Sequence, residues 1–160
     1  EPTCLKSLVE DTMLLLEREF RKFRIQVELD LQQTTELPLF ANDIQRVLVN
    51  LLINARQATP EGGFVRVSLS QTQDDVVLTV RDNGKGIPAD TLPKIFDPYF
   101  TTKSGPDSTG RGGTGIGLSS CKEIIDAHGG KIRVESSVGK GTAFILRFQM
   151  AGSGTARLAS

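Results

Sequence analysis

The chain has 160 residues, of which 38% are hydrophobic and 24% charged, as is ordinary for one soluble globular domain. It carries 19 basic and 19 acidic residues, no Trp and one Tyr, so neither net charge nor a stacking surface favours a nucleic-acid partner or contact with an anionic membrane. No apolar run reaches the ~20 residues of a membrane-spanning helix, and no signal-peptide pattern is present.

The cysteines and the histidine argue against a disulfide or a metal site. Cys4 and Cys121 lie far apart and lack CxxC spacing, which favours reduced thiols and therefore a cytoplasmic location. His128 is the single histidine and cannot form a metal site alone.

The first part of the chain predicts a helix followed by a strand. Residues 5–23 set apolar side chains among charged ones, as in an amphipathic helix: Leu8, Leu15, Leu16 and Phe20. Residues 24–32 alternate apolar and polar side chains, as in a strand, and Pro38 interrupts the chain after it. Because the sequence starts abruptly in this helical pattern, we expect a piece of a longer protein.

Residues 43–59 predict a helix with two different faces. One is a buried apolar stripe at i, i+3, i+4, i+7 spacing, formed by Ile44, Val47, Leu48, Leu51, Leu52 and Ala55. The other is polar and is formed by Asp43, Arg46, Asn50, Asn54 and Gln57. Two Asn residues one turn apart lower helix stability, because their side chains compete for backbone groups. The simpler interpretation is that this polar face is solvated. Residues that oppose the local secondary-structure preference, as these Asn residues do, often mark functional sites, so we interpret the polar stripe as facing a ligand.

A hairpin follows this helix, because alternating residues at 65–69 and 76–80 are joined by a short polar connection. Residues 115–128 then return to helical spacing until a pair of glycines stops the helix. Residues 131–136 and 141–149 predict a second hairpin.

This order of elements indicates an α+β fold, a two-layer α/β sandwich in which a mixed sheet carries its helices on one face. We expect one domain over residues 1–150. Residues 151–160 are small, polar and patternless, as expected of a disordered tail or a linker.

The loop at residues 82–88 directly follows a predicted strand and is rich in glycine, which permits positive φ and lets a flat ligand approach the backbone. An ionised Asp82 only accepts hydrogen bonds, so it would favour a ring with an exocyclic amino group, such as adenine, over guanine. A plain Asn-Gly turn is the alternative.

Residues 101–114 form a long polar loop of the kind that serves as a lid. It runs into Gly113-Thr-Gly-Ile-Gly-Leu118 at the start of a helix, where free N–H groups form an anion site. Because amide oxygens suit Mg²⁺ alongside phosphates, the Asn helix, the acidic loop, the lid and this helix start together describe a Mg-nucleotide site.

Five motifs follow one another along the chain: Asn50-Leu-Leu-Ile-Asn54-Ala55, Asp82-Asn-Gly-Lys-Gly86, Ile95-Phe-Asp-Pro-Tyr-Phe-Thr-Thr-Lys103, Gly113-Thr-Gly-Ile-Gly-Leu118 and Gly139-Lys-Gly-Thr142. In this order they resemble the N box, first glycine box, F box, second glycine box and last glycine box of the catalytic, ATP-binding domain of bacterial two-component sensor histidine kinases. That domain belongs to the superfamily of gyrase, Hsp90 and MutL, and the resemblance extends from Leu5 to Phe148.

The resemblance implies a Bergerat-type ATP-binding fold with a lid over the triphosphate, and ATP and Mg²⁺ as cofactors. Asn54 would bind Mg²⁺ with Asn50 in support, Asp82 would receive the adenine amino group, and Phe96 and Phe100 would anchor the lid. The implied nucleotide-binding residues are Asn50, Asn54, Gln57, Asp82, Gly84, Gly86, Ile87, Lys103, Gly113, Thr114, Gly115, Gly117, Leu118 and Thr142.

Gln57 departs from the family pattern, because many members carry a phosphate-facing Lys there. Arg56, Arg46 or Lys103 could supply the missing charge, and the sequence leaves open which of them does. Arg46 itself stands where the family often has Gln.

The resemblance implies transfer of the γ-phosphoryl group of ATP to a histidine on a separate helical hairpin, with a response regulator downstream. His128 is interpreted as a helix-terminus residue and not as the phosphoacceptor. We expect this chain to be monomeric and the full protein to dimerise through the missing hairpin. We expect this chain to be cytoplasmic, as the cytosolic portion of a sensor, whether or not the full protein is anchored in a membrane.

Other functions remain open from the sequence. An ATP-hydrolysing switch is disfavoured, because Asn50 stands where such relatives place a Glu base and an amide takes no proton at neutral pH. A nucleotide-gated docking module without phosphotransfer is kept open by Gln57. An anti-sigma serine kinase fits the F box less well.

Overall fold

The computed structural model describes residues 2–97 and 117–150, so the predictions for the lid and for the C-terminal tail lie outside the described residues. Within these ranges, one five-stranded sheet has the spatial order β2 (Gln26–Leu31), β4 (Phe64–Gln71), β5 (Asp75–Asp82), β7 (Gly141–Gln149) and β6 (Gly130–Ser137). β2 is parallel to β4, and the other neighbouring strands of this sheet are antiparallel.

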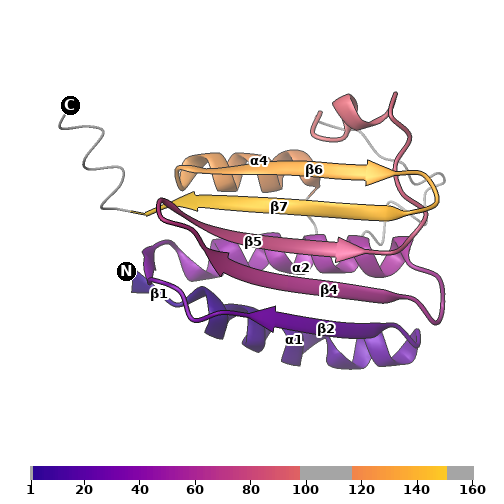
Figure 1. The fold of residues 1–160 in the computed structure, drawn as a ribbon, viewed down its shortest axis with the longest axis horizontal. Coiled ribbons are helices and arrows are strands. Elements are labelled where there is room, and N and C mark those ends of the chain that lie inside the picture. The colour runs from indigo at the N-terminus through magenta and orange to yellow at the C-terminus, as the bar shows by residue number, and fades with distance from the viewer. Residues whose placement is uncertain (1, 98–116, 151–160) are drawn as a thin grey trace.

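The helices lie against one face of the sheet (Figure 1): α1 (Leu5–Lys22), α2 (Ala41–Ala58) and α4 (Leu118–Ala127). The predicted α+β sandwich with a mixed sheet is therefore confirmed, as are the two hairpins, β4–β5 and β6–β7. In the described part of the chain, no helix has both the length and the apolar character that crossing a bilayer requires.

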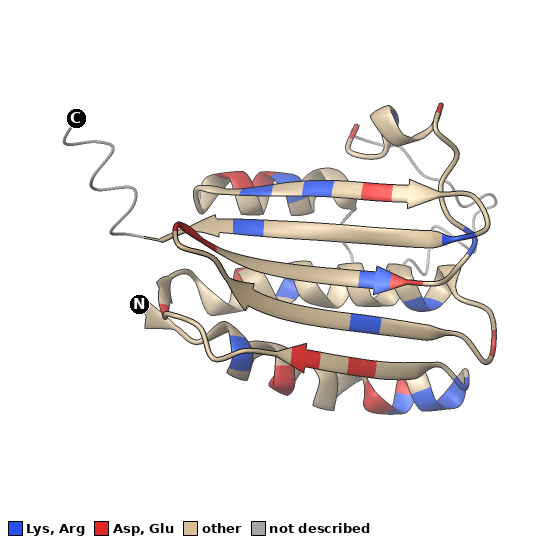
Figure 2. Cartoon of the chain, viewed as in Figure 1, with Lys and Arg blue, Asp and Glu red and all other residues tan. Residues whose placement is uncertain are grey.

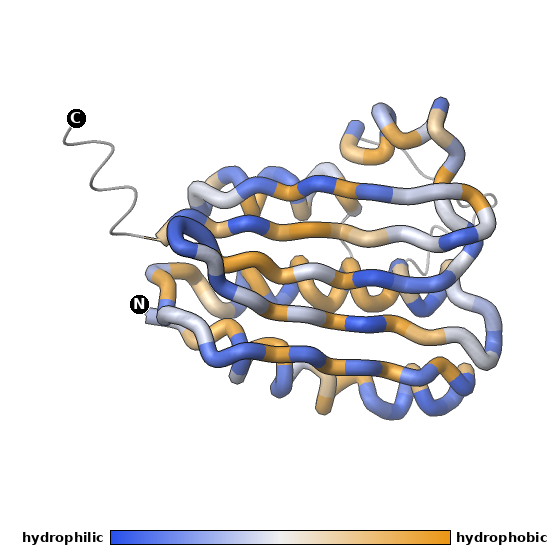
Figure 3. Tube along the Cα trace, viewed as in Figure 1, coloured by the Kyte–Doolittle hydropathy of each residue, from blue (hydrophilic) through white to orange (hydrophobic). Residues whose placement is uncertain are grey.

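The core lies between the sheet and these helices. Alternate residues of β5 are buried, and Val76, Leu78 and Val80 expose no more than 1% of their surface. Figure 3 shows hydrophobic residues recurring along the strands and along the helices behind them. Burying one such side chain contributes about 1.5–3 kcal/mol, so the period-two pattern of the strands fixes which face turns inward.

α2 is the helix that brings the core and the candidate site together, because it packs against α1, α4 and β5. It begins two residues earlier than the predicted range 43–59 and ends one residue sooner. All six residues of the predicted apolar stripe are buried. Asn50, which was assigned to the polar stripe, is also buried, with 3% of its surface exposed.

Several element boundaries differ from the predictions. The strand predicted from residue 24 begins at Gln26, because Arg24 adopts φ 57° and closes the end of α1. The Ile25 N–H bonds to the Phe20 carbonyl at 2.9 Å, which is the hydrogen bond of a Schellman motif. The helix predicted from residue 115 begins at Leu118, since Gly117 is an extended N-cap.

Three short elements were not predicted. β1 (Pro2–Thr3) pairs with β3 (Leu37–Pro38), and a 3-10 turn, η1, covers Leu92–Lys94. Two or three residues are too few to show a hydrophobic period.

Charges of both signs are interspersed over the elements (Figure 2). On the edge of the sheet, Arg66 of β4 lies 3.1 Å from Asp30 and 3.7 Å from Glu28, both on β2. These pairs are exposed and contribute little to stability, but they place opposite charges across the parallel strand pair.

Candidate functional site

The candidate site lies where the loop after β5 meets the end of α2 and the β6–β7 turn. The Lys85 N–H bonds to the Ala58 carbonyl at 3.1 Å, and the Gly139 N–H bonds to the Lys85 carbonyl at 2.9 Å. Asp82 on β5 is paired in register with Thr142 on β7. The first and last glycine boxes and the end of the helix that carries the N box are therefore held together by backbone contacts.

Asp82 is a buried carboxylate at the end of β5, with 5% of its surface exposed. Burial raises the pKa of Asp82, while hydrogen bonds from the backbone N–H groups of Gly84 and Thr142 and the charge of Arg81 act in the opposite direction. The Gly84 N–H lies 2.8 Å from Asp82 Oδ1. A fixed, desolvated hydrogen-bond acceptor of this kind is suited to binding an exocyclic amino group.

Ser136 connects three parts of the site and was missed from the sequence. Its hydroxyl accepts a hydrogen bond from the Ile87 N–H at 2.8 Å and donates to the Gly141 carbonyl at 2.9 Å. It also lies 2.8 Å from Thr142 Oγ1. A Ser in an alternating strand carries no recognisable signal, so only the fold reveals that Ser136 orders the loop.

Ser136→Ala should lower the free energy of unfolding by about 1–2 kcal/mol, because the partly buried Ile87 N–H loses its acceptor. Urea denaturation monitored by circular dichroism measures this change. Ser137→Ala is the matched control, since Ser137 is exposed at the next position of β6. Equal stability of the two variants would contradict the role of Ser136.

The glycines of the loop pack against protein backbone. A Cβ on Gly84 would lie 2.2 Å from the Ala58 carbonyl oxygen, and one on Gly86, whose φ is +80°, would lie 2.1 Å from the Ser137 carbonyl oxygen. We predicted that these glycines let a ligand approach closely. In the structure, the groups in close approach are the end of α2 and the β6–β7 turn, which fixes the loop beside Asp82.

The polar stripe of α2 does not share one environment. Asn50 is buried against α4, where its Nδ2 donates a hydrogen bond to Cys121 Sγ at 3.2 Å. Asn54 is half-buried one turn further along, and Gln57 is exposed. Gln57 lines a pocket of about 400 Å³ together with Asn83 and Lys85.

Of the three basic residues that could supply the charge missing at Gln57, Arg56 and Arg46 lie within the described residues and Lys103 does not. Arg56 turns toward α1, where it lies 3.1 Å from Glu19 and 4.2 Å from the centre of the Phe23 ring. Arg46 is exposed, and its charge offsets a small part of the rise that burial causes in the pKa of Cys121. Lys85, which was not among the cations predicted to act here, lines the same pocket as Gln57.

Part of the predicted site lies outside the described residues: Phe100, Lys103, Gly113, Thr114 and Gly115. Of the remainder, Gly117 caps α4 and Leu118 begins its first turn. Phe96 packs edge-on against Phe144, with ring centres 6.5 Å apart, as expected of a residue that anchors the following segment in the core.

The chemistry of the site fits Mg²⁺ shared with a nucleotide. The described residues contain no group of three or more His, Cys, Asp or Glu side chains that could hold a metal ion. Mg²⁺ is commonly bound by one or two protein oxygens together with phosphate oxygens. Asn54 and Asn50 supply amide oxygens one helical turn apart, so the donor set is compatible with this mode of binding.

His128 is the C-cap residue of α4, as predicted. Its Nδ1 lies 2.8 Å from the Ile124 carbonyl, and its Nε2 accepts a hydrogen bond from the Phe40 N–H at 3.3 Å. Nδ1 thus closes the end of α4 itself, and Nε2 joins that end to Phe40, the N-cap residue of α2.

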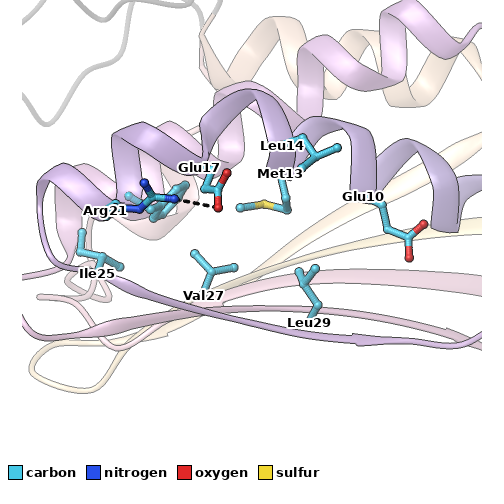
Figure 4. A pocket seen from close by; sticks show the side chains of 9 residues that line it. Glu10, Met13, Leu14, Glu17, Arg21, Ile25, Val27 and Leu29 are labelled. Atoms are coloured by element: carbon cyan, nitrogen blue, oxygen red, sulfur yellow. Dashed lines mark ion pairs between the residues drawn. The ribbon is translucent and has the colours of Figure 1, made fainter.

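A separate groove of about 560 Å³ lies between α1 and the edge strand β2 (Figure 4). Met13, Val27 and Leu29 line it, and Arg21 pairs with Glu17 at its border. None of the predicted site residues that the structure describes lines this groove.

Both the fold and the arrangement of the loops are those of an ATP-binding domain, and comparison with known proteins agrees. The family model described as "Histidine kinase-, DNA gyrase B-, and HSP90-like ATPase" matches residues 41–152, which is more than half of the chain. The chain belongs to this family. Within the family, its relatives are sensor histidine kinases.

The chain is 37% identical over 143 residues to the sensor histidine kinase ZraS of Escherichia coli (strain K12), covering 89% of this chain and 29% of that protein. It is 40% identical over 128 residues to the alginate biosynthesis sensor protein KinB of Pseudomonas aeruginosa, covering 80% of this chain and 20% of that protein. The chain therefore spans less than a third of these relatives.

Solved structures give the same result. The catalytic domain of the histidine kinase ThkA, in a nucleotide-free form, has a TM-score of 0.79 and 31% identity to this chain, and covers 93% of this chain and 94% of that domain. The histidine kinase ThkA in complex with the response regulator protein TrrA has a TM-score of 0.77 and 29% identity, covering 93% of this chain and 41% of that one.

Proposed function

We propose that this chain binds Mg-ATP and transfers its γ-phosphoryl group to a histidine on a separate dimerisation and phosphoacceptor domain of the same kinase, which passes it to a response regulator. The observation that carries the proposal is the buried acceptor Asp82, held beside the glycine loop and the Asn-bearing helix. Residues up to 150 form the ATP-binding domain. The whole protein dimerises through the helical hairpin. The present chain acts in the cytoplasm.

In this proposal Asp82 accepts the adenine amino group, with Thr142 beside it on the neighbouring strand. Asn54 and Asn50 hold Mg²⁺, which neutralises phosphate charge when it is bound. The chain supplies no covalent intermediate, so its contribution is to position the nucleotide and to stabilise charge.

A hydrolytic switch fits this site less well. Asn50 is an amide with 3% of its surface exposed, and its nitrogen is hydrogen-bonded to a sulfur. Such a group cannot accept the proton of an attacking water.

Radiolabelled phosphoryl transfer tests the proposed function. The chain is incubated with γ-labelled ATP, Mg²⁺ and the separately produced histidine hairpin domain of its own full-length protein. We expect the label on the hairpin and none on a hairpin in which the reactive histidine is replaced by Gln. ATP binding without transfer would instead support a docking module, and rapid phosphate release without a labelled protein would support a hydrolase.

A further inference from the structure

A buried thiol on α4 contacts the amide of the N-box residue Asn50. Cys121 has 0% of its surface exposed and Asn50 has 3%. Asn50 Nδ2 donates a hydrogen bond to Cys121 Sγ at 3.2 Å. Because water does not reach this contact, loss of the sulfur would leave an amide N–H in an apolar environment without that partner.

Burial raises the pKa of Cys121 to about 11. Because 0% of its surface is exposed, Cys121 is not accessible to a nucleotide or a metal ion in solution. Its sulfur is a weak acceptor within the first turns of α4, the helix that begins at the second glycine box.

The contact is one interaction that orients the Asn50 side chain. A carboxamide is planar and carries its nitrogen and its oxygen on opposite sides, and the two ends are nearly equal in size. Packing alone does not distinguish one orientation from the other. With Nδ2 directed at Cys121 Sγ, the oxygen, which is the atom that Mg²⁺ accepts as a ligand, is directed away from the sulfur.

We propose that Cys121 is a positioning residue that fixes the amide of Asn50, so that its oxygen is the atom offered to the Mg-nucleotide. This inference rests on the proposed function, since it assigns a role within the same site. It links α4 to α2 through one hydrogen bond across the packed helices. The competing account is that Cys121 only fills space in the core.

Two substitutions distinguish these accounts. Cys121→Val keeps an apolar side chain of similar size and removes the acceptor, whereas Cys121→Ser keeps a hydrogen-bonding atom at the same place. Cys4→Val is the matched control, because Cys4 is the other cysteine and caps α1, away from the site. Thermal melts of all three variants establish that each is folded.

The first readout needs no nucleotide. In ¹⁵N-labelled protein, we expect the side-chain NH₂ signals of Asn50 to shift in the Cys121→Val variant, and to stay dispersed in the Cys121→Ser and Cys4→Val variants. Unchanged Asn50 signals in the Cys121→Val variant would overturn the proposed contact.

The second readout is the Mg²⁺ concentration that half-maximally tightens ATP binding, measured by calorimetry. Residues that orient a metal ligand typically change metal affinity by about 10–100-fold, so we expect a rise of roughly 10-fold for Cys121→Val and little change for Cys121→Ser. Affinity for ATP without Mg²⁺ should stay the same. If the Val and Ser variants lose ATP affinity equally, or if the loss is the same with and without Mg²⁺, Cys121 has only a packing role. If the unaltered chain does not bind Mg-ATP, the proposed function fails, while the NMR result still decides the contact.

Discussion

Replacing Asp82 with Asn is expected to weaken ATP binding by about 10–100-fold, because a buried hydrogen bond to a charged group is worth roughly 1.5–3 kcal/mol. The Asp82→Asn variant keeps an oxygen that can accept the Gly84 N–H. Its second oxygen becomes an NH₂ group, which donates and cannot accept from the adenine amino group. The preference for ATP over GTP should fall with the affinity.

The same substitution should leave the fold close to its original stability. Burial raises the pKa of Asp82, so ionised Asp82 is less stable in the folded protein than in the unfolded chain. In the Asp82→Asn variant, the stability gained by removing the buried charge offsets the stability lost with one backbone hydrogen bond. Calorimetric titration gives the affinity and a thermal melt gives the stability, with the exposed Asp90→Asn variant as control. Unchanged ATP selectivity in the Asp82→Asn variant would contradict the assignment.

The raised pKa of Asp82 also gives a pH dependence with a definite sign. Asp82 contributes to the free energy of unfolding in full when the pH is below the ordinary Asp pKa. This contribution is lost as the pH rises through the raised pKa of Asp82 in the folded protein. ATP binding should show the opposite trend, weakening as acid protonates the carboxylate. The Asp82→Asn variant should lack both changes, which urea denaturation and ATP titration over the acidic range can measure.

Asn54→Ala is expected to remove the Mg²⁺-dependent part of ATP binding. Asn54 is half-buried one turn from Asn50, and its substitution removes an amide oxygen of the type that binds Mg²⁺ beside phosphates. ATP binding without Mg²⁺ should change little, because adenine recognition lies at Asp82. Asn42→Ala, an exposed position near the start of α2, serves as the control.

Parallel titrations of the two Asn variants with ATP, in Mg²⁺ and in excess chelator, provide this measurement. The Asn54→Ala variant should bind equally weakly in both buffers, and the Asn42→Ala variant should tighten with Mg²⁺ as the unaltered chain does. Full Mg²⁺ dependence in the Asn54→Ala variant would place the metal elsewhere.

The regular elements were predictable because each buries one face. The apolar stripe of α2 and the alternation in β5 predict which apolar side chains are buried, so helix and strand could be assigned without knowledge of the fold. The boundaries depend on single residues. Arg24 adopts a left-handed conformation usually taken by Gly, which the sequence does not signal, and the strand after it starts later than predicted.

The site was predictable in its motifs but not in its contacts. Asn50 and Asn54 share a helical stripe, yet only the packing of α4 shows that Asn50 meets Cys121. Arg56 is next to the stripe in sequence, and its pairing with Glu19 depends on where α1 lies. Ser136 is distant in sequence from the loop that it holds. Contacts between elements of this kind follow from the tertiary arrangement and leave no local pattern.

The central claim is that this chain carries a site for Mg-ATP, and calorimetric titration of the unaltered chain tests it most directly. ATP is titrated with Mg²⁺ and with chelator, and GTP is titrated under the same conditions. We predict binding that prefers ATP to GTP and that tightens when Mg²⁺ is present. Equal binding of ATP and GTP, or no binding of either, would contradict the account.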